Sequence, residues 1–493
     1  MPRRRRCCGC LPLLRASSEV WSLSSQAMAD LTIRNITATP LELKLMERFE
    51  AQPAVGGGRK NITSRVTGIF NSTSALAAKI EAQGDARDRR EVSIPIAPFE
   101  TRVTDLRTAD PGREVVRLTF EADGHRYQVD VPSASHRSTV MDNLDGGPNE
   151  YTVVYVLTGS CLSIFSSAHL ASWMRELRDE YPLSALSIPG THNSPTCHVA
   201  LPSVRCQAVG VREQLENGVR FFDIRVNVNP DSSELALVHA AFPISLTGSK
   251  YFKNMLDVIY AFLDANPSET LIMSVKREGT GRGTDQRLSM ILKEKFYEDG
   301  KRWYTEPRIP NLGEVRGKIV LLRRHLNDES LDKEWGGRGW GLDGSVWPDN
   351  CADGRVGSGI ARVQDFYEID QSTNIQKKIE LARSHLERAA EPVCPLPPAG
   401  TEAPPPQPFF INFLSASNFF RANCWPEKIA AKANPAIIEY LCLRHGEPGK
   451  GPVGLDVGDA GTGIVVTDWV GQEGDWDLIR CIVGWNAKLQ VKQ

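Results

Sequence analysis

The segment Leu186-Ser187-Ile188-Pro189-Gly190-Thr191-His192-Asn193-Ser194 decides the fold, because it places a histidine directly after a short apolar strand. Two more stretches of the same kind follow: Val219–Val226, which contains Arg225, and Leu235–His239, which ends on a second histidine. Short apolar strands with polar residues at their C-terminal ends are typical of parallel α/β sheets, where functional groups collect at that edge. The sequence therefore predicts that His192, Arg225 and His239 lie close together.

These three residue types suit proton transfer around a phosphate group. Histidine titrates near neutral pH, so one histidine can accept a proton while another donates one. Arginine keeps its charge and can bind two phosphate oxygens at once.

From Ser167 onward, helices alternate with short apolar strands, which predicts a parallel α/β barrel. Helices are expected over Tyr251–Leu263 and Ile375–Ala390. Besides Val219–Val226 and Leu235–His239, the expected strands are Ala185–Ile188, Thr270–Val275, Lys318–Leu322, Phe409–Leu414 and Gly463–Asp468.

Residues 31–160 predict a small, mostly β, sandwich-like domain in front of the barrel. Its expected strands are Leu31–Arg34, Val92–Ile96, Val115–Phe120, Arg126–Val131 and Tyr151–Leu157, with a charged break at Glu81–Arg90. No chemistry is evident in this domain, so lipid binding and a structural or partner-binding role are both open.

The remaining regions are expected to be irregular. Residues 1–30 predict a disordered tail that is basic and contains Cys7, Cys8 and Cys10, which could carry acyl groups beside the arginines. The Pro-rich stretch 392–408 predicts a surface insertion in a barrel of residues 165–493. The chain has no run of 18 apolar residues and a net charge of −2, so neither a membrane-spanning helix nor a nucleic-acid partner is expected.

A series of collinear motifs resembles the bacterial type of phosphatidylinositol-specific phospholipase C. The resemblance runs from about residue 173 to about residue 470 and leaves the first 150 residues outside. The motifs are Ile188–Thr196, Phe222–Arg225, Leu235–His239, Asn266–Lys276, Arg316–Arg324, Trp347–Asn350, Val363–Asp365, Ile411–Phe413 and Val465–Asp468. The resemblance implies a distorted TIM-type (β/α) barrel.

The resemblance also implies a role for each matching residue. His192 would be the general base that activates the inositol 2-hydroxyl, and His239 the general acid. Arg225 would neutralise the phosphate, Asp223 would support the acid side of the site, and Asp468 would orient His192. The residues expected around the inositol ring are Asn193, Lys276, Arg324, Asp365 and Tyr367.

Asn193 departs from the family pattern, which has an aspartate after the base histidine. A carboxylate at that position would support Arg225 and His239, and asparagine lacks its charge. In calcium-dependent eukaryotic relatives an asparagine here is a metal ligand. The cation of Arg225 would repel calcium, which prefers 6–8 oxygen ligands, so no metal cofactor is expected, although calcium remains an alternative.

The sequence is thus interpreted as a phospholipase C that cleaves phosphatidylinositol, or a glycosylated form, to diacylglycerol and inositol 1,2-cyclic phosphate. The expected protein is a cytoplasmic monomer that binds the phospholipid surface peripherally, with secretion left open. Two alternatives stay open: a lipid-binding protein with a decayed site, and a glycerophosphodiesterase-like barrel enzyme.

Overall fold

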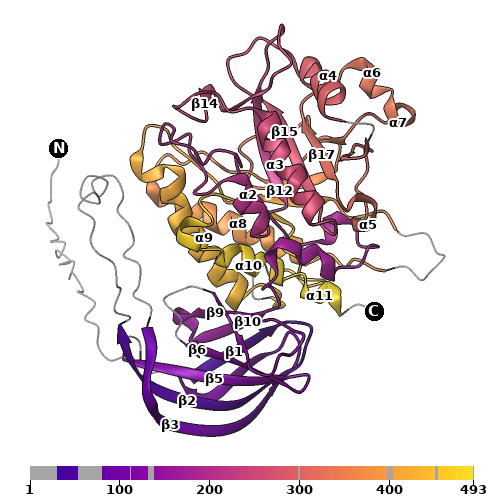
Figure 1. The fold of residues 1–493 in the computed structure, drawn as a ribbon. Coiled ribbons are helices and arrows are strands. Elements are labelled where there is room, and N and C mark those ends of the chain that lie inside the picture. Colours follow the sequence, from indigo (N-terminus) through magenta and orange to yellow (C-terminus); the bar gives the residue numbers. More distant parts are fainter. Residues whose placement is uncertain are drawn as a thin grey trace, which may run out of the picture.

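A computed structural model describes residues 30–53, 80–110, 113–131, 138–297, 300–396, 404–449 and 454–491. The basic tail with its three cysteines, and the middle of the Pro-rich stretch, lie outside these residues. Within them, no helix is both long and apolar enough to cross a membrane. Figure 1 shows a β-rich region at one end of the molecule, next to α10 and α11 of a larger α/β region.

Two five-stranded sheets form the β-rich region, in the orders β4-β1-β10-β9-β7 and β3-β2-β5-β6-β8. All the pairings are antiparallel except that of β1 with β10. The strands are β1 (Asp30–Ile36), β2 (Leu41–Pro53), β3 (Ile80–Ile96), β4 (Thr101–Arg107), β5 (Glu114–Ala122), β6 (His125–Val131), β7 (Thr139–Val140), β8 (Asp142–Asn143), β9 (Thr152–Val156) and β10 (Cys161–Phe165).

The two sheets share one apolar core, to which Ile33 and Leu162 contribute from one sheet and Leu43 and Phe120 from the other. The charged break expected at Glu81–Arg90 is wrong, because these residues lie inside β3, a 17-residue strand. β2 and β10 were not among the expected strands, and β10 carries the β-rich region to Phe165 rather than to residue 160.

Parallel strands in the order β17-β15-β12-β11-β22-β21-β20 form the centre of the α/β region. These strands are β11 (Ile188–Thr191), β12 (Phe221–Asn227), β15 (Leu271–Arg277), β17 (Ile319–Arg324), β20 (Ala361–Gln364), β21 (Phe409–Phe413) and β22 (Ile464–Thr467). Short strands extend the sheet: β13 (Ala236–His239), β14 (Phe242–Pro243), β16 (Trp303–Tyr304), β18 (Leu342–Asp343) and β19 (Gly354–Arg355). The parallel strands at the centre are buried, which explains why they contain near-continuous apolar runs.

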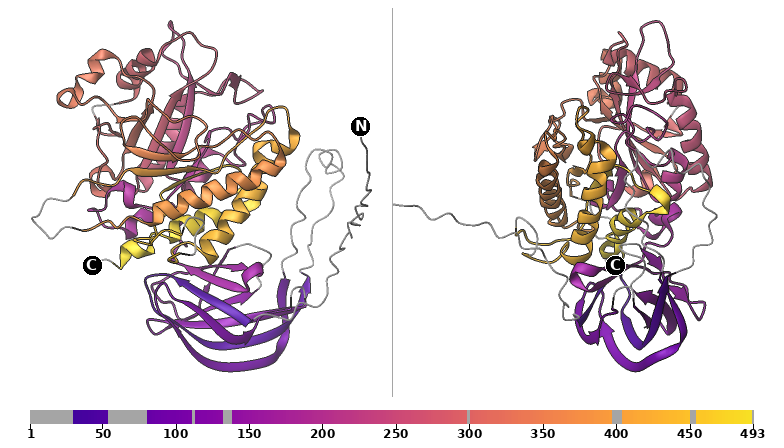
Figure 2. Two further views of the ribbon diagram at one scale, coloured as in Figure 1. Left: turned by 180° about the vertical axis from the view of Figure 1, so that it is seen from behind. Right: turned by 90° about the vertical axis from the view of Figure 1, so that its left-hand side faces the viewer.

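Helices flank this sheet, as two further views show (Figure 2). They are α2 (Val211–Glu216), α3 (Phe252–Ala265), α4 (Asp285–Phe296), α5 (Leu312–Val315), α6 (Glu329–Asp332), α7 (Glu334–Gly337), α8 (Ile375–Ala390), α9 (Pro426–Leu443), α10 (Asp477–Gly484) and α11 (Ala487–Gln490). The helix expected at Ile375–Ala390 matches α8, and α3 begins one residue after the expected start of its helix.

Strand register brings the polar ends of neighbouring strands into one row. Arg225 of β12 lies opposite Lys276 of β15, and Lys276 lies opposite Arg324 of β17. On the other side of β12, Thr191 is in register with Thr467, so His192 and Asp468 leave their strands side by side. The C-terminal edge of the sheet thus gathers residues that lie far apart in the sequence.

The β-rich region is fixed to the α/β region by buried polar contacts. The guanidinium group of Arg34, on β1, donates to the carbonyl oxygens of Cys442, at 2.9 Å, and His445. Its charged end lies over the ring of Trp485, 5.3 Å from the centroid. Because Arg34 is buried, replacing it would remove this donor from the carbonyl oxygen of His445, whereas that of Cys442 would keep its bond from Ser163 Oγ at 3.1 Å.

Candidate active site

The loop after β11 holds His192 by contacts with two other segments of the chain. The His192 backbone N–H donates to the carbonyl oxygen of Thr467 at 2.9 Å, and its Nδ1 lies 3.0 Å from Asp468 Oδ1. Gln207 Nε2 donates to the carbonyl oxygen of His192 at 2.7 Å. With Nδ1 bound to the carboxylate, Nε2 is the nitrogen available for proton transfer.

Asp468 is only 2% exposed, and burial raises the pKa of its carboxyl group despite the neighbouring His192. A buried carboxylate bound to Nδ1 fixes the tautomer of an imidazole and stabilises its protonated form. The pair can therefore act as an oriented general base.

His239 lies at the end of β13 and faces His192, with ring centroids 5.7 Å apart and an interplanar angle of 89°. Its Nδ1 lies 2.9 Å from the carbonyl oxygen of Val204 and 3.6 Å from Cys206 Sγ. Burial, followed by the charges of Arg225 and His192, holds the pKa of His239 well below its usual range. A bound phosphodiester would oppose the Arg225 charge and favour protonation of His239, as a general acid requires.

Arg225 is held in place by two carboxylates. Its Nε and Nη2 donate to Asp223 Oδ2 at 3.2 and 3.1 Å, and its Nη1 donates to Glu278 Oε1 at 3.0 Å. Although burial works against it, Arg225 and then Arg324 hold the pKa of Asp223 well below its usual range. Arg225 and Lys276 lower the pKa of Glu278 to about 2 in the same way. Both carboxylates are therefore charged at neutral pH and compensate Arg225.

Backbone conformation explains why residue 193 is a short polar side chain. Asn193 has a φ of 43°, a left-handed conformation that asparagine and aspartate adopt more readily than most residues. Its backbone N–H donates to Asp223 Oδ2 at 3.1 Å, and its Nδ2 lies 3.1 Å from His192 Nε2. The side chain thus contacts the base histidine. The support of Arg225 that a carboxylate at this position would give, and that asparagine lacks, comes from Asp223 and Glu278.

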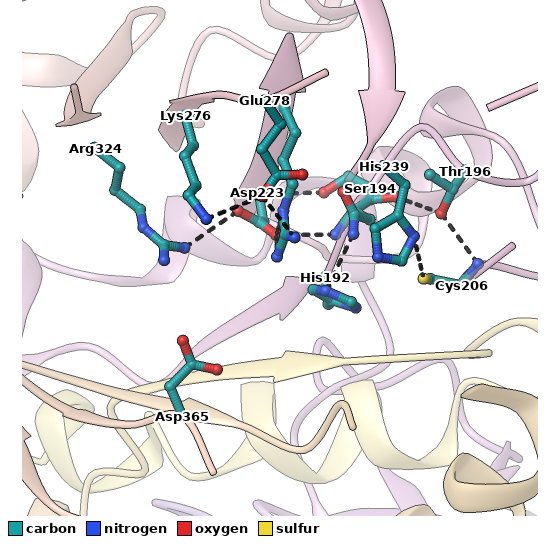
Figure 3. Close-up of polar contacts among 12 residues, drawn as sticks. His192, Ser194, Thr196, Cys206, Asp223, His239, Lys276, Glu278, Arg324 and Asp365 are labelled. Atoms are coloured by element: carbon teal, nitrogen blue, oxygen red, sulfur yellow. Dashed lines mark hydrogen bonds and ion pairs between the residues drawn. The ribbon is translucent and has the colours of Figure 1, made fainter. Parts of the chain in front are cut away.

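The remaining expected site residues form a second part of the site beside the histidines (Figure 3). Lys276 Nζ donates to Glu278 Oε1 at 2.9 Å, and Arg324 Nη1 lies 3.6 Å from Asp223 Oδ1. In Figure 3, Asp365 lies across the site from Lys276 and Arg324, and its Oδ2 accepts a hydrogen bond from the indole of Trp347 at 3.0 Å. Cations and a carboxylate that face one another in this way can bind several hydroxyl groups.

Trp347 and Tyr367 border this second part of the site. The guanidinium carbon of Arg324 lies 3.9 Å from the centroid of the Trp347 ring. The Tyr367 hydroxyl donates to Asp349 Oδ1 at 3.1 Å. Nε and Nη1 of Arg324 are buried and make no hydrogen bond within the described residues, and Nη1 has only the longer ion pair with Asp223, so both keep hydrogen-bonding capacity.

Four residues of the site were not assigned roles from the sequence: Glu278, Cys206, Gln207 and Trp347. Glu278 follows Lys276 by two residues and so lies on the same side of its strand, a signal that the sequence did offer. Cys206 and Gln207 lie in the loop between β11 and α2, where no periodic pattern marks them. Within the described residues, His192, Cys206 and His239 are also the one group of three side chains whose ligand atoms lie close enough to hold a metal ion.

Parts of this chain are similar to known proteins. Residues 180–325 match the family model described as phosphatidylinositol-specific phospholipase C, X domain. A 1-phosphatidylinositol phosphodiesterase of Listeria monocytogenes is 37% identical over 178 residues, which cover 34% of this chain and 53% of the relative. The chain thus spans about half the length of that relative. A 1-phosphatidylinositol phosphodiesterase of Staphylococcus aureus is 25% identical over 343 residues, or 65% of this chain and 91% of the relative.

Among solved structures, a phosphatidylinositol-specific phospholipase C of Staphylococcus aureus, studied for modulation of its membrane binding, has a TM-score of 0.50. It is 24% identical and covers 65% of this chain and 98% of its own. This likeness supports the α/β fold of the larger region.

Proposed function

We propose that this protein cleaves the phosphodiester bond of phosphatidylinositol, as the match of residues 180–325 to the family model of the phosphatidylinositol-specific phospholipase C X domain supports. The products are diacylglycerol and inositol 1,2-cyclic phosphate. The proposal includes a distorted TIM-type barrel of residues 165–493, preceded by a sandwich-like domain that has no part in the chemistry.

The observation that carries the proposal is the pair of facing histidines beside a fixed arginine. His192 is oriented by Asp468, and His239 by the carbonyl oxygen of Val204. His192 takes the proton of the inositol 2-hydroxyl, whose oxygen attacks the adjacent phosphorus. His239 gives a proton to the departing diacylglycerol oxygen, and Arg225 compensates the charge that develops on the phosphoryl oxygens.

Inositol recognition is assigned to the second part of the site. Lys276, Arg324 and Asp365 offer donors and an acceptor to the ring hydroxyls, and Tyr367 packs against the ring. Asn193, between His192 and Asp223, is close enough to the base to contact the reacting hydroxyl.

A cleavage assay tests the function directly. The full-length protein is mixed with phosphatidylinositol vesicles, with and without a chelator, and the phosphorus products are followed by nuclear magnetic resonance. We expect inositol 1,2-cyclic phosphate at the same rate in both samples, because Arg225 supplies the positive charge. Binding without turnover would favour a decayed lipid-binding protein, and loss of activity in chelator with recovery in calcium would contradict the metal-free mechanism.

We further propose that exposed apolar residues beside the site contact the phospholipid surface. Phe420 is 92% exposed and packs against Phe419, which stacks on Phe242 with ring centroids 5.8 Å apart. Val199 and Leu246, also exposed, are joined by a backbone hydrogen bond of 2.9 Å. These residues follow β11, β13 and β21, so they lie at the same edge of the sheet as the histidines.

Replacing Phe420 by serine is expected to weaken vesicle binding by about ten- to a hundredfold, because burying an aromatic side chain in lipid contributes on the order of 1.5–3 kcal/mol. Sedimentation with mixed phosphatidylcholine and phosphatidylinositol vesicles measures the binding. The matched control is Val103→Ser, at a position 70% exposed on β4 of the β-rich region. Cleavage rates are then compared on vesicles and on a soluble short-chain substrate. If Phe420→Ser lowers both rates equally, a membrane role for Phe420 is contradicted.

A further inference from the structure

A cysteine that the proposed mechanism does not use lies against both of its histidines. Cys206 Sγ is 3.6 Å from His239 Nδ1, and this sulfur and one ring nitrogen of each histidine all lie within 4.8 Å of one another. Zn–S and Zn–N bonds of about 2.3 and 2.0 Å place two ligand atoms of one tetrahedral zinc roughly 3.5 Å apart. Small side-chain rotations would therefore bring all three atoms onto a single ion.

The three ligands are held by contacts with the surrounding loops. The Cys206 backbone N–H donates to Thr196 Oγ1 at 3.1 Å. The Cys206 carbonyl oxygen accepts a hydrogen bond from the backbone N–H of Trp469 at 2.9 Å. The carbonyl oxygen of Val204 lies 3.6 Å from Cys206 Sγ and 2.9 Å from His239 Nδ1, and it places both groups beside each other until the ion replaces their protons. A site that is fixed before the ion arrives loses little freedom on binding.

Asp468 prepares His192 for a metal as well as for catalysis. A metal-bound histidine usually donates its other ring N–H to a carboxylate or a carbonyl oxygen. His192 Nδ1 is bound to Asp468 at 3.0 Å, which leaves Nε2 to face the site. The charge of Arg225, the nearest cation, is compensated by Asp223 and Glu278.

We propose that His192, Cys206 and His239 bind one Zn²⁺ ion, which occupies both histidines and thereby inhibits the enzyme. Thiolate and imidazole ligands favour zinc over calcium or magnesium, which prefer oxygen. On binding, the Cys206 thiol releases its proton to solvent and the two histidines bind through unprotonated nitrogens. Fewer protons then remain on the site, so zinc binds more tightly as the pH rises.

This inhibition rests on the proposed function, whereas zinc binding does not. Binding can therefore be measured apart from activity, with Co²⁺ as a spectroscopic substitute for zinc. A thiolate bound to Co²⁺ gives a charge-transfer band in the near ultraviolet that nitrogen ligands alone do not give. The band is recorded whether or not the protein cleaves phosphatidylinositol.

The experiment uses the full-length protein without an affinity tag. Cys7, Cys8 and Cys10 form a separate group of thiols, so the background carries Cys7→Ser, Cys8→Ser and Cys10→Ser. The test variant is Cys206→Ser. The control is Cys442→Ser, which removes a buried thiol of α9 that lies 3.9 Å from Cys481 Sγ.

We expect the background protein and Cys442→Ser to bind one Co²⁺ with the thiolate band, and one Zn²⁺ to inhibit each reversibly. In Cys206→Ser the band should be absent, and inhibition relative to its own metal-free rate should need at least about tenfold more zinc, the ratio that 1.4 kcal/mol represents. A background protein without the band, or equal zinc sensitivity in Cys206→Ser, would overturn the proposal. If the band forms but no phosphatidylinositol is cleaved, the zinc site stands and the proposed function fails.

Discussion

Replacing either His192 or His239 by alanine is expected to lower kcat on phosphatidylinositol by at least 10²–10⁴-fold, the usual contribution of general acid–base catalysis, or about 3–5 kcal/mol of transition-state stabilisation. Without His192, the inositol 2-hydroxyl keeps its proton and is a poor nucleophile. Without His239, the diacylglycerol oxygen leaves as an unprotonated alkoxide. Initial rates on vesicles measure the change, and circular dichroism shows whether the fold is kept.

The matched control for this pair is His169→Ala. His169 has a half-exposed side chain that forms an ion pair with Glu150 at 3.4 Å, away from the two catalytic candidates. It should keep the wild-type rate. A rate within a few-fold of wild type in either His192→Ala or His239→Ala, with the fold intact, would contradict the assigned roles.

The pH dependence of kcat/KM should change when Arg225 is replaced. The free enzyme holds His239 neutral through burial and the charges of Arg225 and His192, so its proton is gained as the anionic substrate binds. His192 carries no charge when it acts as the base, so Arg225 is the charge that opposes this proton in the active enzyme. Residual activity in Arg225→Ala, measured as kcat/KM across about pH 5–8, should therefore extend to higher pH than in the wild type, because the acid stays protonated longer.

The C-terminal edge of the parallel strands was the part of the site most accessible from sequence. Strands that are buried on both faces have clear apolar runs, and the ionisable residues at the C-terminal end of each run lie at the same edge of the sheet. That rule alone is enough to group His192, Arg225 and Lys276. The register of β12 with β15 and β17 then places Arg225, Lys276 and Arg324 in one row.

Contacts made by loops could not be read from the sequence. Cys206 and Gln207 reach the site because the chain after β11 folds back over His192, and their spacing has no period to reveal it. Asp223 alone was expected from the sequence to be the supporting carboxylate, but Glu278 also compensates the charge of Arg225. Only the geometry shows that Asn193 contacts the base and not the acid.

The wrong break at Glu81–Arg90 has a separate cause. β3 is an edge strand, and the polar side chains of its Glu81–Arg90 part are mostly exposed, so this part has no apolar face to mark it. Its charges pair instead with neighbouring strands, as in the ion pairs of Arg87 with Glu50 and Arg90 with Asp105. Charged edge strands are common because they discourage pairing between molecules, and sequence patterns based on burial miss them.

Replacing Arg225 by alanine is expected to lower kcat by about 10²–10³-fold, the usual effect of removing a group that stabilises developing negative charge. Asp223 and Glu278 would also lose their shared partner inside the site, and with only Arg324 and Lys276 left to compensate them, their charges would repel the phosphate more strongly. Arg225→Lys keeps the charge but not the two-point geometry, so its rate should fall between those of the wild type and Arg225→Ala. Initial rates, together with urea unfolding of each variant, separate the loss of chemistry from a loss of stability.

The effect of added calcium shows whether Arg225 or a metal ion neutralises the phosphate. Arg225→Ala leaves Asp223 and Glu278, the two carboxylates that bind the guanidinium group in the wild type, facing the vacated volume as oxygen ligands. If Arg225 performs the work of a metal, calcium should leave the wild-type rate unchanged, and any recovery by calcium should occur only in Arg225→Ala. The control is Arg212→Ala, whose side chain is 62% exposed on α2 and which should keep the wild-type rate. Stimulation of the wild type by calcium, with little loss in Arg225→Ala, would show that Arg225 does not neutralise the phosphate and that the oxygen ligands around it serve a metal.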